Sequence, residues 1–89
     1  MAHEVIHQPE LRRFVIVENG MAAYVEYKIT EYEGGVIFDI IHTFVPEEFR
    51  GRGLASELVE TAYDYAVSSG MRVKASCSYA SGWLLRHLK

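Results

Sequence analysis

The chain has 89 residues, of which 49% are hydrophobic and 24% charged, and its formal net charge is −3. This length allows one small domain, the apolar content excludes a disordered chain, and the acidic balance disfavours a general nucleic-acid-binding protein. The single cysteine excludes an internal disulfide framework and a multi-cysteine zinc site. Because the sequence contains no membrane-spanning apolar run and no signal core in residues 1–10, we expect a cytoplasmic protein with no membrane partner.

The first half of the chain is predicted to form an antiparallel meander. Residues 1–10 have no clear period and are expected to be loose. Strands are expected over residues 11–17, 21–30 and 36–45, because apolar residues alternate in the first two and the third is apolar on both faces. Asn19-Gly20 is a strong hairpin signal, since both residues tolerate positive φ, and Gly34-Gly35 mark a second turn.

The second half is predicted to add a strand–helix–strand crossover. A polar, glycine-bearing loop at residues 46–53 precedes a helix over 54–69, which Gly70 would end. A fourth strand over 71–76 and a final helix over 81–88 follow. The predicted fold class is therefore α/β with a mixed sheet: a three-strand antiparallel meander, a crossover that makes the third and fourth strands parallel, and a C-terminal helix, as a single domain over 1–89.

The most informative motif is the segment Arg50-Gly51-Arg52-Gly53-Leu54-Ala55, between a predicted buried strand and a helix. The first turn of a helix has unpaired N–H groups, glycines let a phosphate approach the backbone, and the arginines add positive charge. These features predict a pyrophosphate site, although neither the dinucleotide fingerprint nor the P-loop motif is present. The alternative is that Gly51 and Gly53 merely shape the turn from strand to helix.

Arg50-x-x-Gly53-x-Ala55 resembles the Gln/Arg-x-x-Gly-x-Gly/Ala motif of the GNAT superfamily of acyl-CoA-dependent N-acetyltransferases. Segments 42–45 and 76–79 are similar to those of very small stand-alone GNAT-like proteins. The resemblance implies a minimal GNAT-like fold, acetyl-CoA as the donor, and two core strands that splay to admit the pantetheine arm. The residues that it implies in coenzyme A binding are Phe44, Val45, Arg50, Gly51, Arg52, Gly53, Leu54 and Ala55.

This chain departs from the larger superfamily at the acceptor side. Full-length members carry helices between the first two strands, which Asn19-Gly20 replaces here, and a C-terminal strand pair that is missing. Those elements build much of the acceptor site in the larger members. The acceptor therefore stays open between an amine of a protein and an amine of a small molecule, and the oligomeric state is not predicted.

Acetyl transfer needs a neutral amine, but a lysine with a pKa near 10.4 is neutral in about one molecule in 2,500 at pH 7. His42 is a candidate catalytic base, because an imidazole titrates near neutral pH and this residue lies on the strand expected to line the cleft. The alternative is a histidine packed to fix that strand. Asp39 and Glu47 are weaker candidates for the same role.

Cys77 is the second candidate catalytic residue. It ends the fourth predicted strand, opposite Phe44 and Val45 and just before the last helix, whose N-terminus would lower the pKa of a thiol. Its thiol could carry the acetyl group, contact the cofactor, or pack as a small apolar group. Tyr79 is a candidate to protonate the leaving thiolate, as a tyrosine does in many GNAT enzymes. The histidines show no metal-ligand spacing, so no metal is expected.

The sequence thus favours a slow acetyl-CoA-dependent N-acetyltransferase, acting by direct transfer rather than through an acetyl-Cys77 intermediate. The alternative is a coenzyme-A-binding module without catalysis, acting as a sensor or partner domain. A nucleic-acid-binding module is disfavoured by the acidic balance.

Overall fold

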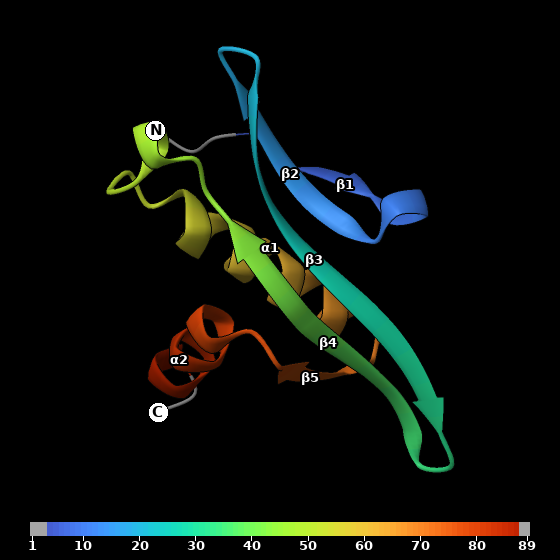
Figure 1. Cartoon of the computed structure of the whole chain (residues 1–89). Helices are drawn as coiled ribbons and strands as arrows, with labels where there is room; N and C mark the ends of the chain where they lie inside the picture. The colour runs from blue at the N-terminus through green and yellow to red at the C-terminus, as the bar shows by residue number, and fades with distance from the viewer. Residues whose placement is uncertain (1–3, 88–89) are drawn as a thin grey trace.

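The computed structural model describes residues 4–87, so the predicted helix end at Leu88 lies outside the described residues. Five strands form one sheet in the order β1-β2-β3-β4-β5, and helices pack beside it (Figure 1). The elements are β1 (Ile6–Gln8), η1 (Pro9–Leu11), β2 (Arg13–Glu18), β3 (Met21–Tyr32), β4 (Gly35–Phe44), η2 (Glu47–Phe49), α1 (Leu54–Ser68), β5 (Arg72–Ala75) and α2 (Ser78–His87). Strands β1 to β4 are antiparallel and β5 is parallel to β4, which confirms the predicted meander, crossover and mixed α/β class.

Strand β1 is an element that the sequence did not predict. Its three residues pair with β2, with Ile6 opposite Val15, although residues 1–10 were expected to be loose. His7 fixes this edge strand, because its Nε2 lies 2.6 Å from the hydroxyl oxygen of Tyr27 and its ring stacks on Phe14 at 4.2 Å. A three-residue strand is too short to show a period, so tertiary contacts rather than local pattern determine it.

These contacts predict a pH-dependent stability. Burial lowers the pKa of His7 below 6.5, and Glu10 opposes this effect. At a pH between the folded and the unfolded pKa values, the unfolded chain binds more protons than the folded one. The contribution of neutral His7 to the free energy of unfolding is therefore fully present above about pH 6.5 and decreases as the pH falls below it. We expect the thermal midpoint of His7→Gln, which keeps a hydrogen-bonding side chain beside Tyr27, to fall less than that of the unchanged protein between about pH 7 and pH 5. Equal losses in the two proteins would contradict this assignment.

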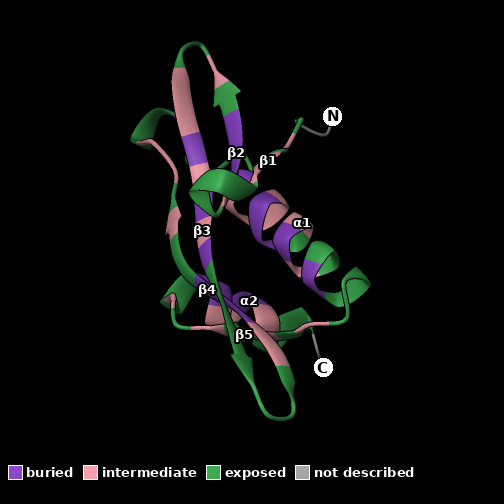
Figure 2. Ribbon diagram, turned by 90° about the vertical axis from the view of Figure 1, so that its right-hand side faces the viewer, coloured by how far each residue is buried: buried purple, intermediate pink, exposed green. Residues whose placement is uncertain are grey.

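Helix α1 covers one face of the sheet and forms the core with it. The helix is amphipathic, and Figure 2 shows its buried residues turned toward the strands. The largest side chains that are completely buried come from both layers: Phe38, Ile16, Ile40, Leu54, Leu58, Val15, Val25 and Val59. Alanines at positions 62 and 66 are fully buried, which lets the helix approach the sheet closely. The helix ends at Ser68, and Gly70 follows at φ 78°, as predicted for a C-terminal glycine.

One residue of β4 is left out of its ladder with β3. Tyr27 pairs with Ile40 and Glu26 pairs with His42, so Ile41 forms a β-bulge. Beyond the bulge Thr43 pairs with Val25, whose side chain belongs to the core, while His42 lies on the opposite face. The bulge therefore decides which side chains at the end of β4 can reach the helices.

The β4–β5 ladder ends early, at Ile40 and Ala75, while β4 continues to Phe44. Asp39, which is only 3% exposed, holds the chain where it leaves β5. The N–H and the hydroxyl group of Ser76 donate to its two carboxylate oxygens, each at 2.9 Å. The chain then turns into α2, which begins at Ser78, three residues before the predicted start at Ser81.

Candidate functional site

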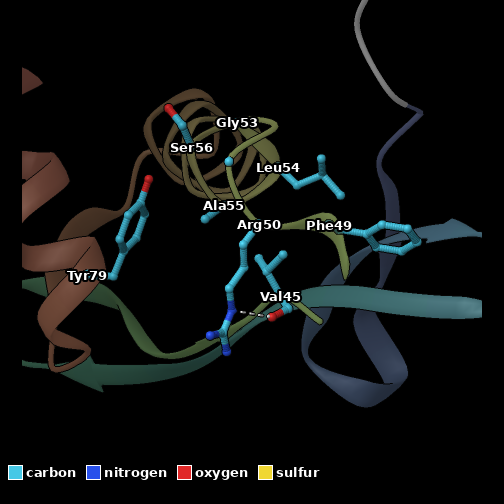
Figure 3. A pocket seen from close by; sticks show the side chains of 9 residues that line it. Val45, Phe49, Arg50, Gly53, Leu54, Ala55, Ser56 and Tyr79 are labelled. Carbon is cyan, nitrogen blue, oxygen red and sulfur yellow. Dashed lines mark hydrogen bonds between the residues drawn. The ribbon is translucent and has the colours of Figure 1, made fainter. Parts of the chain in front are cut away.

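Two adjoining pockets lie between the end of β4, the start of α1 and the first turn of α2. The first has a volume of about 200 Å³ and is lined by Val45, Phe49, Arg50, Gly51, Gly53, Leu54, Ala55, Ser56 and Tyr79 (Figure 3). The second, of about 340 Å³, is lined by Thr43, Phe44, Val45, Arg50, Ala55 and Tyr79. Because Val45, Arg50, Ala55 and Tyr79 line both, the two pockets form one hollow from the helix start to the end of β4.

The start of α1 has the hydrogen-bond donors and the open space that suit an anion. Gly51 and Gly53 have φ values of 85° and 79°, and a Cβ on either would meet nothing within 4 Å. No side chain caps the helix, and its first backbone hydrogen bond runs from the N–H of Glu57 to the carbonyl oxygen of Gly53. The N–H groups of residues 54–56 therefore have no acceptor within the helix, and they stand at the positive end of its dipole. A phosphate group fits this set of donors.

The two arginines of the loop take different positions. Arg50 lines both pockets, and its Nε donates to the carbonyl oxygen of Val45 at 3.2 Å (Figure 3). Arg52 lines neither pocket: its Nη1 lies 3.8 Å from Oε1 of Glu18, and its guanidinium carbon stands 5.5 Å from the ring centre of Phe49. Of the residues predicted to bind coenzyme A, Arg52 is thus the one that the structure does not bring to the hollow. Its position instead connects the loop to the β2–β3 hairpin.

Cys77 stands at the start of α2, beside this hollow. Its carbonyl oxygen accepts the first helical hydrogen bond, from Ser81 at 2.9 Å, and its Sγ lies 3.4 Å from Oγ1 of Thr43. Burial raises the pKa of the thiol, but hydrogen bonds from the Thr43 hydroxyl and from the N–H groups of Ala80, Tyr79 and Thr43 lower it, and the net direction is downward. Cys77 lines neither pocket, whereas Thr43, which its thiol contacts, lines the second.

The contact with Thr43 can be tested through the reactivity of the thiol. Thr43→Val removes the hydroxyl that stabilises the thiolate, so the pKa of Cys77 should rise and the pH at which iodoacetamide alkylation is half-maximal should increase. Thr61→Val is the matched control, because the Thr61 hydroxyl donates to the carbonyl oxygen of Glu57 within α1. Alkylation profiles that coincide in both variants and the unchanged protein would show that the Thr43 hydroxyl does not act on the thiol.

His42 is not brought to the hollow. Its exposed ring lies 6.0 Å from that of Tyr24 and it pairs across the ladder with Glu26, because the bulge at Ile41 turns it to the other face of β4. The alternative, a histidine packed to fix the strand, also stays a prediction. Asp39 is occupied by Ser76, and Glu47 is exposed in η2 and lines neither pocket. A basic role for any of these three residues stays a prediction.

Sequence reasoning missed Thr43 and Ser56 as residues of this region. Ser56 lines the first pocket from the first turn of α1, directly after the glycine motif. That place next to the motif is a signal that could have identified it, since the first helical turn faces whatever the loop binds. No comparable signal exists for Thr43, because its orientation depends on the bulge.

The described part of the chain contains no group of three or more His, Cys, Asp and Glu side chains that could hold a metal ion. None of the helices within residues 4–87 has the length and apolarity needed to cross a membrane.

In this mixed sheet, β4 leads through a glycine loop into a helix, and β4 and β5 separate beside that loop. These features define a GNAT-like fold. The chain belongs to the GCN5-related N-acetyltransferase family, whose model matches residues 13–89.

Similar proteins agree with this assignment. Protein NATD1 of Bos taurus is 38% identical over 77 residues, which make up 84% of this chain and 66% of the relative. Protein NATD1 of Gallus gallus is 36% identical over 78 residues, or 85% of this chain and 68% of that protein. The chain thus spans about two thirds of the length of these relatives. The crystal structure of an integron cassette protein from the mobile metagenome of Cole Harbour Salt Marsh has the same fold, with a TM-score of 0.68 and 23% identity over 89% of this chain and 53% of that one.

Proposed function

We propose that this chain is an N-acetyltransferase that moves an acetyl group from acetyl-CoA to an amine. The observation that carries the proposal is the hollow that joins an uncapped, glycine-bearing helix start to the end of β4, where the ladder with β5 has ended. Membership of the GCN5-related N-acetyltransferase family supports the same reading.

The residues present fit coenzyme A. The free N–H groups of residues 54–56 and the guanidinium of Arg50 suit its pyrophosphate, and the open space around Gly51 and Gly53 leaves room for a close approach. The second pocket, beside Phe44 and Val45, suits the pantetheine arm. When bound, acetyl-CoA supplies an activated thioester at this end of the hollow.

The chemistry that remains for the chain is to stabilise negative charge and to move protons. With acetyl-CoA bound, a backbone N–H of Phe44 or Val45 would donate to the thioester carbonyl oxygen as the amine nitrogen attacked its carbon. The carbon–sulfur bond would break, and the hydroxyl of Tyr79, which lines the hollow, would give its proton to the departing thiolate. The amine proton goes to solvent water, since His42, Asp39 and Glu47 do not line the hollow. A site with these parts transfers slowly and accepts several kinds of amine.

Cys77 offers a covalent route as an alternative, in which its thiolate takes the acetyl group and coenzyme A leaves before the amine enters. We favour direct transfer, because Cys77 itself lines neither part of the hollow. Cys77→Ser is therefore expected to bind coenzyme A normally and to lose activity by less than about tenfold, through packing and hydrogen bonding alone. Intact-mass measurement after incubation with acetyl-CoA alone checks the route. A single acetyl adduct on Cys77 that an added amine discharges would establish the covalent route instead.

A second candidate function is a coenzyme-A-binding module that transfers nothing. It is favoured by the absence of His, Asp and Glu side chains from the residues that line the two pockets. Two measurements separate the candidates: calorimetric binding of coenzyme A, and release of free coenzyme A from acetyl-CoA in the presence of a lysine peptide, a peptide with a free N-terminus, or a polyamine. Binding without release for all three amines would favour the module, and no binding would exclude both functions.

A further inference from the structure

Asp39 is a buried carboxylate that the proposed mechanism leaves unused. Within residues 4–87 it is the only buried side chain with a formal charge, and it is 3% exposed. Its neighbours Phe38 and Ile40 belong to the core, so the Asp39 side chain lies on the opposite face of β4. A buried charge is costly unless hydrogen bonds compensate it, so the partners of this carboxylate indicate what it does.

The partner of the carboxylate is Ser76, the first residue after β5. The N–H and the hydroxyl group of Ser76 donate to the two carboxylate oxygens, each at 2.9 Å. The same N–H lies 3.0 Å from the carbonyl oxygen of Ile40, which also accepts from the N–H of Cys77 at 3.1 Å. Asp39 and Ile40 thus hold two consecutive residues of the turn at the point where β5 leaves β4.

This turn leads directly into the part of α2 that borders the hollow. The helix begins at Ser78, and Tyr79 in its first turn lines both pockets of the hollow. Burial raises the pKa of the Cys77 thiol, and the N–H groups of Ala80 and Tyr79 are among the donors that lower it overall. The position of the turn therefore determines where the Tyr79 hydroxyl stands and which donors surround the thiol.

We propose that Asp39 is a positioning residue for acetyl transfer: through Ser76 it fixes the turn between β5 and α2 and so places the Tyr79 hydroxyl at the hollow. This inference rests on the proposed function, in which Tyr79 protonates the departing thiolate. Asp39 lines neither pocket, so it acts through the turn and not on the reacting atoms. Its hydrogen bonds go to the α2 side of the hollow and not to the glycine loop, so its loss should change kcat more than the affinity for coenzyme A.

The first test reads the position of the turn through the Cys77 thiol and needs no catalysis. Asp39→Leu removes both bonds to Ser76, whereas the amide of Asp39→Asn can still accept from the Ser76 N–H and donate to its hydroxyl oxygen. When the turn shifts, the N–H groups of Tyr79 and Ala80 move away from the sulfur, so the pKa of Cys77 should rise. The pH of half-maximal iodoacetamide alkylation should therefore increase in Asp39→Leu and not in Asp39→Asn.

Charge alone gives the opposite result in this test. Loss of a nearby negative charge favours a thiolate, so it would lower the alkylation midpoint, and it would do so in both variants. Tyr27→Phe is the matched control for lost stability, because Tyr27 is also 3% exposed and its hydroxyl oxygen lies 2.6 Å from Nε2 of His7. It should lower the thermal midpoint and leave the alkylation midpoint unchanged.

The second test measures acetyl transfer by the folded variants. For Asp39→Leu, kcat should fall at least about tenfold while the dissociation constant of coenzyme A stays within about twofold, because a reacting group is misplaced. Asp39→Asn and Tyr27→Phe should keep kcat within about threefold of the unchanged protein, because the turn stays in place. Ser76→Ala removes only the hydroxyl bond and serves if Asp39→Leu does not fold; it should shift both measurements in the same direction by less.

The other outcomes separate this inference from the proposed function. An alkylation midpoint that does not rise in Asp39→Leu or Ser76→Ala, or that rises equally in Asp39→Asn, would reject the positioning of the turn. A kcat that is unchanged in Asp39→Leu, or that falls equally in Tyr27→Phe, would reject its role in transfer. If the midpoint rises as expected but the unchanged protein acetylates no amine, the proposed function fails while Asp39 still fixes the turn.

Discussion

Tyr79→Phe is expected to lower kcat about a hundredfold while the dissociation constant of coenzyme A stays within about twofold, because it removes one proton donor. Tyr79 comes from the first turn of α2 and lines both parts of the hollow, opposite Ala55 and Ser56 (Figure 3). Phenylalanine keeps the ring that contributes to the wall. The departing thiolate then has no hydroxyl beside it, so the transition state alone loses stabilisation. Steady-state kinetics and calorimetry on the same preparations give the two numbers.

Tyr32→Phe is the control for this experiment. Tyr32 has the same exposure as Tyr79, 39%, but it lies at the tip of the β3–β4 hairpin, away from the helices (Figure 1). It should keep full activity. A Tyr79→Phe protein as active as the Tyr32→Phe protein would remove Tyr79 from the mechanism, and the proton would then have to reach the thiolate from water.

Gly53→Val should raise the dissociation constant of coenzyme A at least about tenfold while the protein still folds. Gly53 precedes α1 with φ 79°, a conformation that costs a β-branched residue about 1–2 kcal/mol. No protein atom lies within 4 Å of an added Cβ, and Gly53 lines the first pocket, so we expect the new side chain to take up space at the proposed phosphate site. Both the loss of backbone geometry and the added bulk act on the N–H groups of the first helical turn. Calorimetry with coenzyme A measures the effect.

Gly70→Val separates backbone strain from the site. Gly70 has φ 78° and also meets nothing within 4 Å of an added Cβ, but it lies after the other end of α1. The two variants should therefore lose similar thermal stability, and only Gly53→Val should lose affinity. A folded Gly53→Val protein with unchanged affinity would reject the loop as the pyrophosphate site.

Most of the fold could be predicted from the sequence because its signals are local. Alternating apolar residues, the Asn19-Gly20 turn and the helical stripe that ends before Gly70 each determine a nearby element. The earlier start of α2 and the added strand β1 depend instead on distant partners. His7 is placed by Phe14 and Tyr27, and the turn after β5 is placed by Asp39, so no window of local sequence contains this information.

The candidate site could likewise be predicted only in part, where its residues are neighbours in the sequence. The glycine motif predicted the helix start, Arg50 and the neighbouring end of β4, since the chain itself brings them together. Both Arg50 and Arg52 were predicted to bind coenzyme A, and the contacts of Arg52 with Glu18 and Phe49 separate them in the fold. His42 was proposed as a base because it lies on the strand expected to line the cleft. The bulge at Ile41 breaks the alternation just before it.

Because of the same bulge, the residues of β4 that face the core have even numbers before Ile41 and odd numbers after it. Before Ile41 the even-numbered side chains, Phe38 and Ile40, face α1 and are fully buried. After it an odd-numbered side chain, Thr43, pairs with Val25 on the core face and reaches Cys77. The alternation of inward and outward side chains is thus shifted by one residue between the half of β4 that packs in the core and the half that borders the hollow. Before the bulge, a substitution of Phe38 or Ile40 therefore disturbs the core, whereas after it a substitution of Thr43 alters the border of the hollow.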